Sequence, residues 1–117
     1  MQKRIAILGS TGSIGTQALE VISAHPEKFE VEVLTAQNNV DLLIEQSIRY
    51  KPNMVVIGKE DLYEKIKLAL SDHPIKVYCG ADAIGQVCAF DSVDMVLTAM
   101  VGFSGLKSVI IRVLLPI

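Results

Sequence analysis

The sequence predicts an α/β fold in which a mostly parallel, doubly wound sheet carries helices on both faces. Short apolar, β-branched runs recur along the 117 residues, as expected of strands buried in a parallel sheet. Stretches with apolar residues at helical spacing lie between those runs, and this alternation is typical of a parallel sheet covered by helices. The length suits one small domain, since domains commonly have about 100–150 residues.

The first predicted unit is a strand, a glycine-rich loop and a helix. Residues 4–8, Arg-Ile-Ala-Ile-Leu, are typical of a buried strand. The helix beyond the glycines must end at Pro26, which cannot continue it. Its apolar face consists of Ile14, Ala18, Val21 and Ile22, at positions i, i+4, i+7 and i+8.

A second strand is predicted over residues 29–36, followed by a second helix. Phe29, Val31 and Val33 alternate with Glu30 and Glu32, which indicates that one face of the strand's first half lies nearer water. The helix can be capped by Asn39 and is closed by Pro52. Asp41 lies in its first turn, and the residues at helical spacing are Val40, Leu43, Ile44, Ser47 and Ile48.

Three more strands and two more helices are predicted in the second half. The strands cover residues 54–57, 75–79 and 94–99; one helix carries Leu62, Ile66, Ala69 and Leu70, and a short one over 81–89 is weakened by Gly85. His25 and His73 each precede a proline, so we interpret both as helix ends rather than catalytic groups. We interpret Asp91 and Asp94 as the entry to the last strand rather than a metal site.

The composition narrows the class of protein. The net charge is only −2, so no basic field would hold a nucleic acid. No apolar run reaches the roughly 18 residues that a membrane span needs, and the first strand reaches Gly9 too soon for a signal peptide. Cys79 and Cys88 lack the spacing of a zinc site, which favours reduced, buried thiols. We therefore expect a cytoplasmic protein without nucleic-acid or membrane partners.

Gly9, Gly12 and Gly15 form a G-x-x-G-x-x-G pattern between the first strand and the first helix. Glycine is needed where the chain leaves the strand, where backbone approaches phosphate, and where the helix packs on the sheet. Free N–H groups and the positive end of the helix dipole favour a pyrophosphate there. The context predicts a Rossmann-like dinucleotide-binding unit.

The residues between the glycines are Ser10, Thr11 and Ser13, whose hydroxyls we expect to donate to phosphate oxygens. A simpler interpretation is a glycine-rich turn that only lets the helix pack tightly. A triphosphatase loop is excluded, because no lysine follows the glycines before Lys28.

The end of the second strand is where a ribose would be recognised. An NAD site usually has Asp or Glu there, about 20 residues past the glycines, whereas this chain has Gln37, Asn38 and Asn39. Their amides can donate to a 2′-phosphate, so NADP is favoured over NAD, although no Arg or Lys supports it. Asn39 can equally serve as a helix cap.

Several segments together resemble the opening of the 1-deoxy-D-xylulose 5-phosphate reductoisomerase family. They cover residues 1 to about 107 and are I-L-G-S-T-G-S-I-G at 7–15, His25-Pro26-Glu27, L-T-A-Q-N-N-V at 34–40, Ile44-Glu-Gln46, Tyr50-Lys-Pro52, A-M-V-G at 99–102 and Gly105-Leu106. The combination is much more specific than the glycine pattern alone.

The resemblance implies an enzyme of the non-mevalonate isoprenoid route. Such an enzyme rearranges a small phosphorylated sugar, 1-deoxy-D-xylulose 5-phosphate, and reduces the intermediate with NADPH, using Mg or Mn; we expect a homo-oligomer. By resemblance the pyrophosphate loop is Thr11, Gly12, Ser13 and Ile14, the adenosine-phosphate loop is Gln37, Asn38 and Asn39, and Ala99 lines the cofactor site. Many members carry Gly-Lys at the positions of Gln37-Asn38, so a cation is missing here.

We therefore expect an NADP-binding domain over residues 1–107 and an atypical tail over 108–117, where the family pattern is lost. The tail is β-branched and apolar, unlike the amphipathic helix expected there. Catalytic and metal-binding residues are expected outside this chain, which should not catalyse alone. Two alternatives are the cofactor domain of another NAD(P)-dependent oxidoreductase, such as a semialdehyde dehydrogenase or dihydrodipicolinate reductase, and a dinucleotide-binding module without catalysis.

Overall fold

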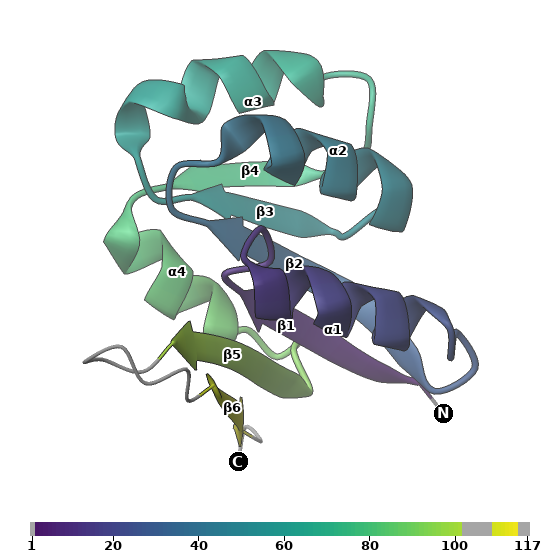
Figure 1. Cartoon of the computed structure of the whole chain (residues 1–117). Coiled ribbons are helices and arrows are strands. Elements are labelled where there is room, and N and C mark those ends of the chain that lie inside the picture. The colour runs from purple at the N-terminus through teal and green to yellow at the C-terminus, as the bar shows by residue number, and fades with distance from the viewer. Residues whose placement is uncertain (1, 102–108, 115–117) are drawn as a thin grey trace.

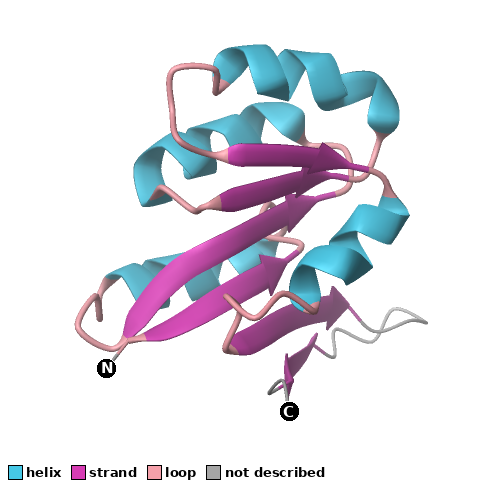
Figure 2. Ribbon diagram, turned by 180° about the vertical axis from the view of Figure 1, so that it is seen from behind, coloured by secondary structure: helices cyan, strands magenta, loops and turns pink. Residues whose placement is uncertain are grey.

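The computed structural model describes residues 2–101 and 109–114, which form one six-stranded sheet with helices on both faces (Figures 1 and 2). The strands are β1 (Lys3–Leu8), β2 (Phe29–Ala36), β3 (Met54–Ile57), β4 (Lys76–Cys79), β5 (Met95–Val101) and β6 (Val109–Leu114). The helices are α1 (Ser13–Ser23), α2 (Val40–Tyr50), α3 (Tyr63–Ala69), α4 (Ala81–Cys88) and the short 3₁₀ turn η1 (Glu60–Leu62). The predicted α/β class is confirmed.

The path of the chain through the sheet explains which face each helix covers. The strand order is β4-β3-β2-β1-β5-β6, and the pairings among β1 to β5 are all parallel. From β1 to β4 the chain moves steadily outward, and α1, α2 and α3 lie on one face; it then returns through α4, on the other face, to place β5 beside β1 (Figures 1 and 2). Right-handed crossovers require this change of face when the direction reverses.

Each face of the sheet has its own apolar core. The core beneath α1, α2 and α3 includes Ile5, Ile7, Leu19, Leu34, Leu43, Val55, Ile57 and Ile66, and the core beneath α4 includes Ala6, Val33, Val56, Val87 and Val96. Strands buried on both sides account for the near-continuous apolar runs in the sequence. Of the helical stripes predicted from spacing, Ile22, Leu43 and Ile66 are buried as expected, but Val21 and Ile48 are exposed. The central buried residue of α1 is Leu19, which the predicted stripe did not include.

One prediction about β2 is wrong, and a β-bulge is the reason. Glu30 is exposed as expected, but Glu32 is 4% exposed and accepts a hydrogen bond from Asn53 Nδ2 at 2.8 Å. The pairing of β1 with β2 passes from Ile5↔Val31 to Ala6↔Val33, so Glu32 is an extra residue in the ladder. Beyond a bulge the alternation changes phase, and Val33 therefore lies on the opposite face from Val31.

The tail after residue 107 forms an edge strand where it is described. β6 pairs antiparallel with β5, from Val101↔Val109 to Val96↔Leu114, which fits the β-branched composition of the segment. Ser108 and residues 115–117 lie outside the described residues, as do Gly102, Gly105 and Leu106 of the family resemblance.

The two histidines lie at helix ends, as predicted. The His25 N–H donates to the carbonyl oxygen of Ile22 at 3.1 Å, after α1, and the His73 N–H donates to that of Leu70 at 3.0 Å, after α3. The imidazole of His25 lies 3.6 Å from the carboxylate of Glu27. Cys79 is a free, partly buried thiol.

An ion pair links the amino ends of β1 and β5. Arg4 Nε lies 3.2 Å from Asp94 Oδ2, and the same oxygen accepts the Arg4 backbone N–H at 2.9 Å. The Asp94 N–H returns a hydrogen bond to the Arg4 carbonyl at 2.8 Å. Hydrogen bonds from the Arg4 side chain and backbone hold the pKa of Asp94 below its usual range. Asp94 thus forms the entry to β5, as the sequence predicted.

We expect Asp94→Asn to destabilise the protein at neutral pH and progressively less in acid. Because its folded pKa is lowered, ionised Asp94 stabilises the fold above the unfolded pKa of about 4, and this contribution is lost as the pH falls through the folded value. Thermal unfolding from pH 7 to 3 measures the difference between wild type and variant. Asp91→Asn is the matched control, since Asp91 contacts Arg4 through its backbone carbonyl. A difference that is constant with pH would contradict the ion pair.

Two glycines inside helices have opposite surroundings. A Cβ on Gly15 in α1 would overlap the carbonyl oxygen of Gly9 and lie 2.7 Å from Ser10 Cα, both backbone atoms. A Cβ on Gly85 in α4 would meet nothing within 4 Å. Gly15 is therefore required by the close approach of α1 to the end of β1, whereas Gly85 only weakens α4.

Alanine at these two positions should change stability in opposite directions. Gly15→Ala should lower the free energy of unfolding by about 1–3 kcal/mol, because the backbone must shift to relieve the overlap. Gly85→Ala should raise it by about 0.5–1 kcal/mol, because alanine is the better helix former. Urea unfolding followed by circular dichroism measures both, and a change of the same sign would refute this assignment.

Candidate cofactor-binding site

The predicted site residues meet at one edge of the sheet. Leu8 at the end of β1 pairs with Thr35 of β2 on one side and with Thr98 of β5 on the other. The three strands are parallel, so the loop after Leu8, the residues after Ala36 and the end of β5 lie together (Figure 1). β1 and β5 are also where the strand order reverses, and open α/β sheets bind ligands in the crevice at such a point.

The glycine loop turns back on the sheet and leaves the start of α1 open. Gly9 has φ +77°, and the N–H groups of Gly9 and Ser10 donate to the Thr35 carbonyl at 3.1 and 2.9 Å. The N-cap of α1 is Gly12, which provides no side-chain cap, and no acidic residue lies in the first turn. Gly12 and Ser13 are exposed. Uncapped N–H groups at an exposed helix start are suited to an anion.

The hydroxyl groups of the loop are not equivalent. Ser10 is fully buried, and its hydroxyl donates to Gln46 Oε1 at 2.8 Å, so the expectation that it binds phosphate is wrong. Ser10 follows the end of β1 by two residues, and its hydrogen bonds go to Thr35 of β2 and Gln46 of α2. Thr11 is partly buried and Ser13 is exposed, so both remain accessible, and Ile14 lies in the first turn of α1.

The second predicted loop lies between β2 and α2, with Gln37, Asn38 and Asn39 all exposed. Asn39 Oδ1 accepts the N–H of Leu42 at 3.3 Å, so Asn39 caps α2, which is one of its two predicted roles. The side chain of Gln37 lies over Gly58, where a Cβ would be 2.5 Å from its Oε1.

Lys59 is a residue at this edge that the sequence analysis missed. Its backbone N–H donates to the Gln37 carbonyl at 2.8 Å, and its side chain is exposed. Lys59 follows β3, whose carboxyl end adjoins that of β2. The strand pattern alone could have found it, because neighbouring parallel strands end at the same edge.

Ala99 lies in β5, one residue past the pair formed by Leu8 and Thr98. This register places its backbone at the level of Gly9, across from the start of the glycine loop. Its side chain falls outside the described side chains. The structure thus brings the backbone positions of all three predicted groups to the same edge.

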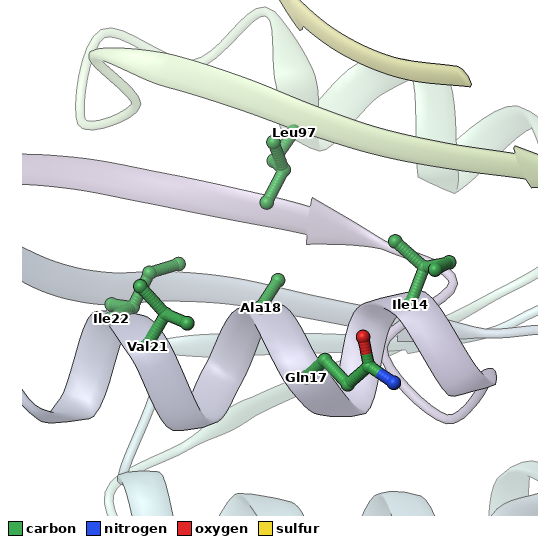
Figure 3. Close-up of a pocket in the computed structure, with 6 residues that line it drawn as sticks. All are labelled: Ile14, Gln17, Ala18, Val21, Ile22 and Leu97. Atoms are coloured by element: carbon green, nitrogen blue, oxygen red, sulfur yellow. The ribbon is translucent and has the colours of Figure 1, made fainter. Parts of the chain in front are cut away.

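An apolar groove adjoins the site on the face that carries α1 (Figure 3). It has a volume of about 300 Å³ and is lined by Ile14, Gln17, Ala18, Val21 and Ile22 of α1 and by Leu97 of β5, whose side chain points toward the helix. A lining with one amide and no charged group offers nothing to replace the hydration of a pyrophosphate. The groove is therefore distinct from the edge where the sequence predicts a phosphate site, and the two meet at Ile14.

The described residues contain neither a cluster of metal ligands nor a membrane-spanning helix. Between residues 2 and 101 and between 109 and 114, no three His, Cys, Asp or Glu side chains are grouped so that they could hold a metal ion. Within the same ranges, no helix has both the length and the apolar character required to cross a membrane.

Comparison with known proteins agrees with the resemblance in the sequence. Residues 5–113 match the family model of 1-deoxy-D-xylulose 5-phosphate reductoisomerase. The reductoisomerase of Phocaeicola vulgatus is 56% identical over 110 residues, which are 94% of this chain and 29% of that protein. The enzyme of Bacteroides thetaiotaomicron is 59% identical over 109 residues, which are 93% of this chain and 28% of that protein. This chain therefore spans less than a third of the length of these relatives.

Solved structures give the same result for the fold. The reductoisomerase of Zymomonas mobilis in complex with NADPH has a TM-score of 0.80 and 30% identity, covering 87% of this chain and 27% of that one. A DOX-P reductoisomerase in complex with magnesium has a TM-score of 0.81 and 28% identity, covering 87% and 26%. The Rossmann-like fold is thereby confirmed. Because the family model matches residues 5–113, which are most of this chain, the chain belongs to the 1-deoxy-D-xylulose 5-phosphate reductoisomerase family.

Proposed function

We propose that residues 1–107 are the NADPH-binding domain of a 1-deoxy-D-xylulose 5-phosphate reductoisomerase. The observation that carries the proposal is the uncapped, exposed start of α1 at the point where the strand order reverses. The close packing at Gly15 is consistent with a pyrophosphate loop, because a Cβ added there would overlap the backbone of Gly9 and Ser10 and push α1 away from the loop. A relative with the same fold, from Zymomonas mobilis, has been solved with NADPH.

In this proposal three segments of the chain bind different parts of the cofactor. Thr11, Gly12, Ser13 and Ile14 hold the pyrophosphate through backbone N–H groups and the hydroxyls of Thr11 and Ser13. Gln37, Asn38 and Asn39 hold the adenosine phosphate, and Ala99 lines the site from β5. NADPH, when bound, supplies the hydride for a reduction. The protein's part is to hold and orient it at the carboxyl edge of the sheet.

Lys59 supports a preference for NADPH over NADH. The cation that many family members carry after the second strand is missing at Gln37-Asn38, and Lys59 is joined to Gln37 by a backbone hydrogen bond of 2.8 Å. An exposed ammonium at this place can pair with a 2′-phosphate, with the Asn38 amide as a further donor. We assign Lys59 the role of that missing cation.

The activity of the whole protein is also part of the proposal. It comprises rearrangement of 1-deoxy-D-xylulose 5-phosphate and NADPH-dependent reduction to 2-C-methyl-D-erythritol 4-phosphate, in the cytoplasm, by a homo-oligomer. We assign the binding of the Mg or Mn ion and of the sugar phosphate to the part of the family's length that this chain does not cover. We assign neither of these roles to the tail over 108–117. Membership of the family argues against another oxidoreductase family. A module without catalysis would be distinguished by sequencing the parent gene beyond residue 117.

Ser13→Asp should separate cofactor binding from folding. A carboxylate in the first turn of α1 interacts favourably with the helix dipole, so stability should be unchanged or rise by about 0.3–1 kcal/mol. The same charge repels a pyrophosphate, so the Kd for NADPH should rise at least about tenfold, equivalent to about 1.4 kcal/mol. Titration followed by nicotinamide fluorescence measures the Kd.

Gln17→Glu is the matched control, because it adds one negative charge a turn further along α1. It should change the Kd by less than about twofold, since the charge is screened and farther from the loop. The proposal fails for this chain if the wild type binds no NADPH at millimolar concentration, or if both variants weaken binding equally.

Lys59→Met should weaken NADPH binding selectively. An exposed ion pair contributes up to about 1 kcal/mol, so the Kd for NADPH should rise about fivefold while the Kd for NADH is unchanged. Lys76→Met, at the amino end of β4, removes the same charge at the opposite edge and should affect neither cofactor. Equal weakening of both cofactors by Lys59→Met would contradict its contact with the 2′-phosphate.

A further inference from the structure

Gln46 lies on the buried face of α2 and reaches the glycine loop from below. It is 5% exposed, and its amide makes two hydrogen bonds of 2.8 Å with Ser10. Oε1 accepts the Ser10 hydroxyl, and Nε2 donates to the Ser10 carbonyl. Two groups of one amide thus hold one residue of the loop across 36 positions in sequence.

Every polar group of Ser10 is used in this contact or in the contact with β2. The Ser10 N–H donates to the Thr35 carbonyl at 2.9 Å, and its carbonyl also accepts the Thr16 hydroxyl at 3.4 Å. Among the described residues, no buried side-chain nitrogen or oxygen lacks a hydrogen-bond partner. Ser10 is therefore fixed from β2, α1 and α2 together, while the loop residues after it remain accessible.

From this geometry we propose that Gln46 is a positioning residue, which holds the glycine loop in the conformation that receives a pyrophosphate. This inference rests on the proposed function, because loop conformation affects cofactor affinity only if the loop binds the cofactor. The contact requires an amide: a carboxylate could accept the hydroxyl but could not donate to the carbonyl. Gln46 also belongs to the helix that Asn39 caps, but its side-chain hydrogen bonds go to the glycine loop.

A role in stability alone is the competing explanation, and Ser47 provides the control. Ser47 is the next residue of α2 and is fully buried, but its hydroxyl donates at 2.7 Å to the Leu43 carbonyl within the helix. Ser47→Ala therefore removes a buried hydrogen bond from α2 without touching the loop. Gln46→Met keeps the shape of the side chain and removes both bonds to Ser10.

Binding is measured for NADPH and for adenosine 2′-monophosphate, which has no pyrophosphate, at a temperature where each variant is folded by circular dichroism. If Gln46→Met lowers the population of the competent loop to about one tenth, the Kd for NADPH rises about tenfold. The Kd for adenosine 2′-monophosphate should change by less than about twofold, and Ser47→Ala should leave both within about twofold. Should Gln46→Met fail to fold, Ser10→Ala, which removes one arm of the contact, should raise the Kd for NADPH about threefold.

Hydrogen exchange tests the loop without any cofactor. The Gly12 N–H donates to the Gly9 carbonyl at 3.2 Å, and its exchange should accelerate about tenfold in Gln46→Met relative to the Val55 amide in β3. In Ser47→Ala the ratio of the two rates should match the wild type. If Gln46→Met behaves like Ser47→Ala in NADPH affinity and in this ratio, Gln46 only stabilises the fold. If the wild type binds no NADPH, the proposed function fails, and the exchange ratio alone decides whether Gln46 positions the loop.

Discussion

The close approach of α1 to the end of β1 is the constraint on which the candidate site depends. Gly15 lies against Gly9 and Ser10 without room for a Cβ, so the chain must leave the strand and enter the helix within a few residues. In so short a turn the polar groups at the strand exit need partners close by. They find them below the loop, in Thr35 of β2 and Gln46 of α2. Gly12 and Ser13 at the helix start are consequently left exposed, on the side where we propose that the cofactor binds.

The order of the strands places this turn where other segments can assist it. Because the chain returns from β4 to the far side of β1, β1 ends between β2 and β5 rather than at an edge. The loops after β2 and β3 adjoin on one side, which brings Lys59 to Gln37. On the other side, β5 faces α1 across the apolar groove of Figure 3, since the helix before β5 lies on the opposite face. One reversal of direction therefore explains both the shared edge and the groove.

Local patterns were sufficient for most of the fold and for part of the site. Helical spacing and apolar runs predicted the strands and helices as far as β5, and the glycine spacing predicted the turn into α1, because these features depend on nearby residues. The buried Glu32 and the inward-facing Ser10 could not be predicted in the same way. Glu32 depends on a register shift against β1, and Ser10 on a partner that is 36 residues away. Leu43, Gln46 and Ser47 share a buried face, so helical spacing could have indicated that Gln46 needs an internal partner.

Residues that hold the loop and residues that would contact the cofactor differ in burial, and this difference explains how the chain tolerates its departure from the family pattern. Ser10, Thr35 and Gln46 are each at most 5% exposed, and Ser10 is hydrogen-bonded to both of the others, so a change at any of them alters the loop itself. Gln37 and Asn38 are exposed, and their backbone carbonyls accept the N–H groups of Lys59 and Val40. Replacing Gly-Lys by Gln-Asn at such positions would change which groups face a 2′-phosphate in the proposed site without disturbing the sheet. A cation lost from one loop can then be replaced from the next strand, because parallel strands deliver their loops to the same edge.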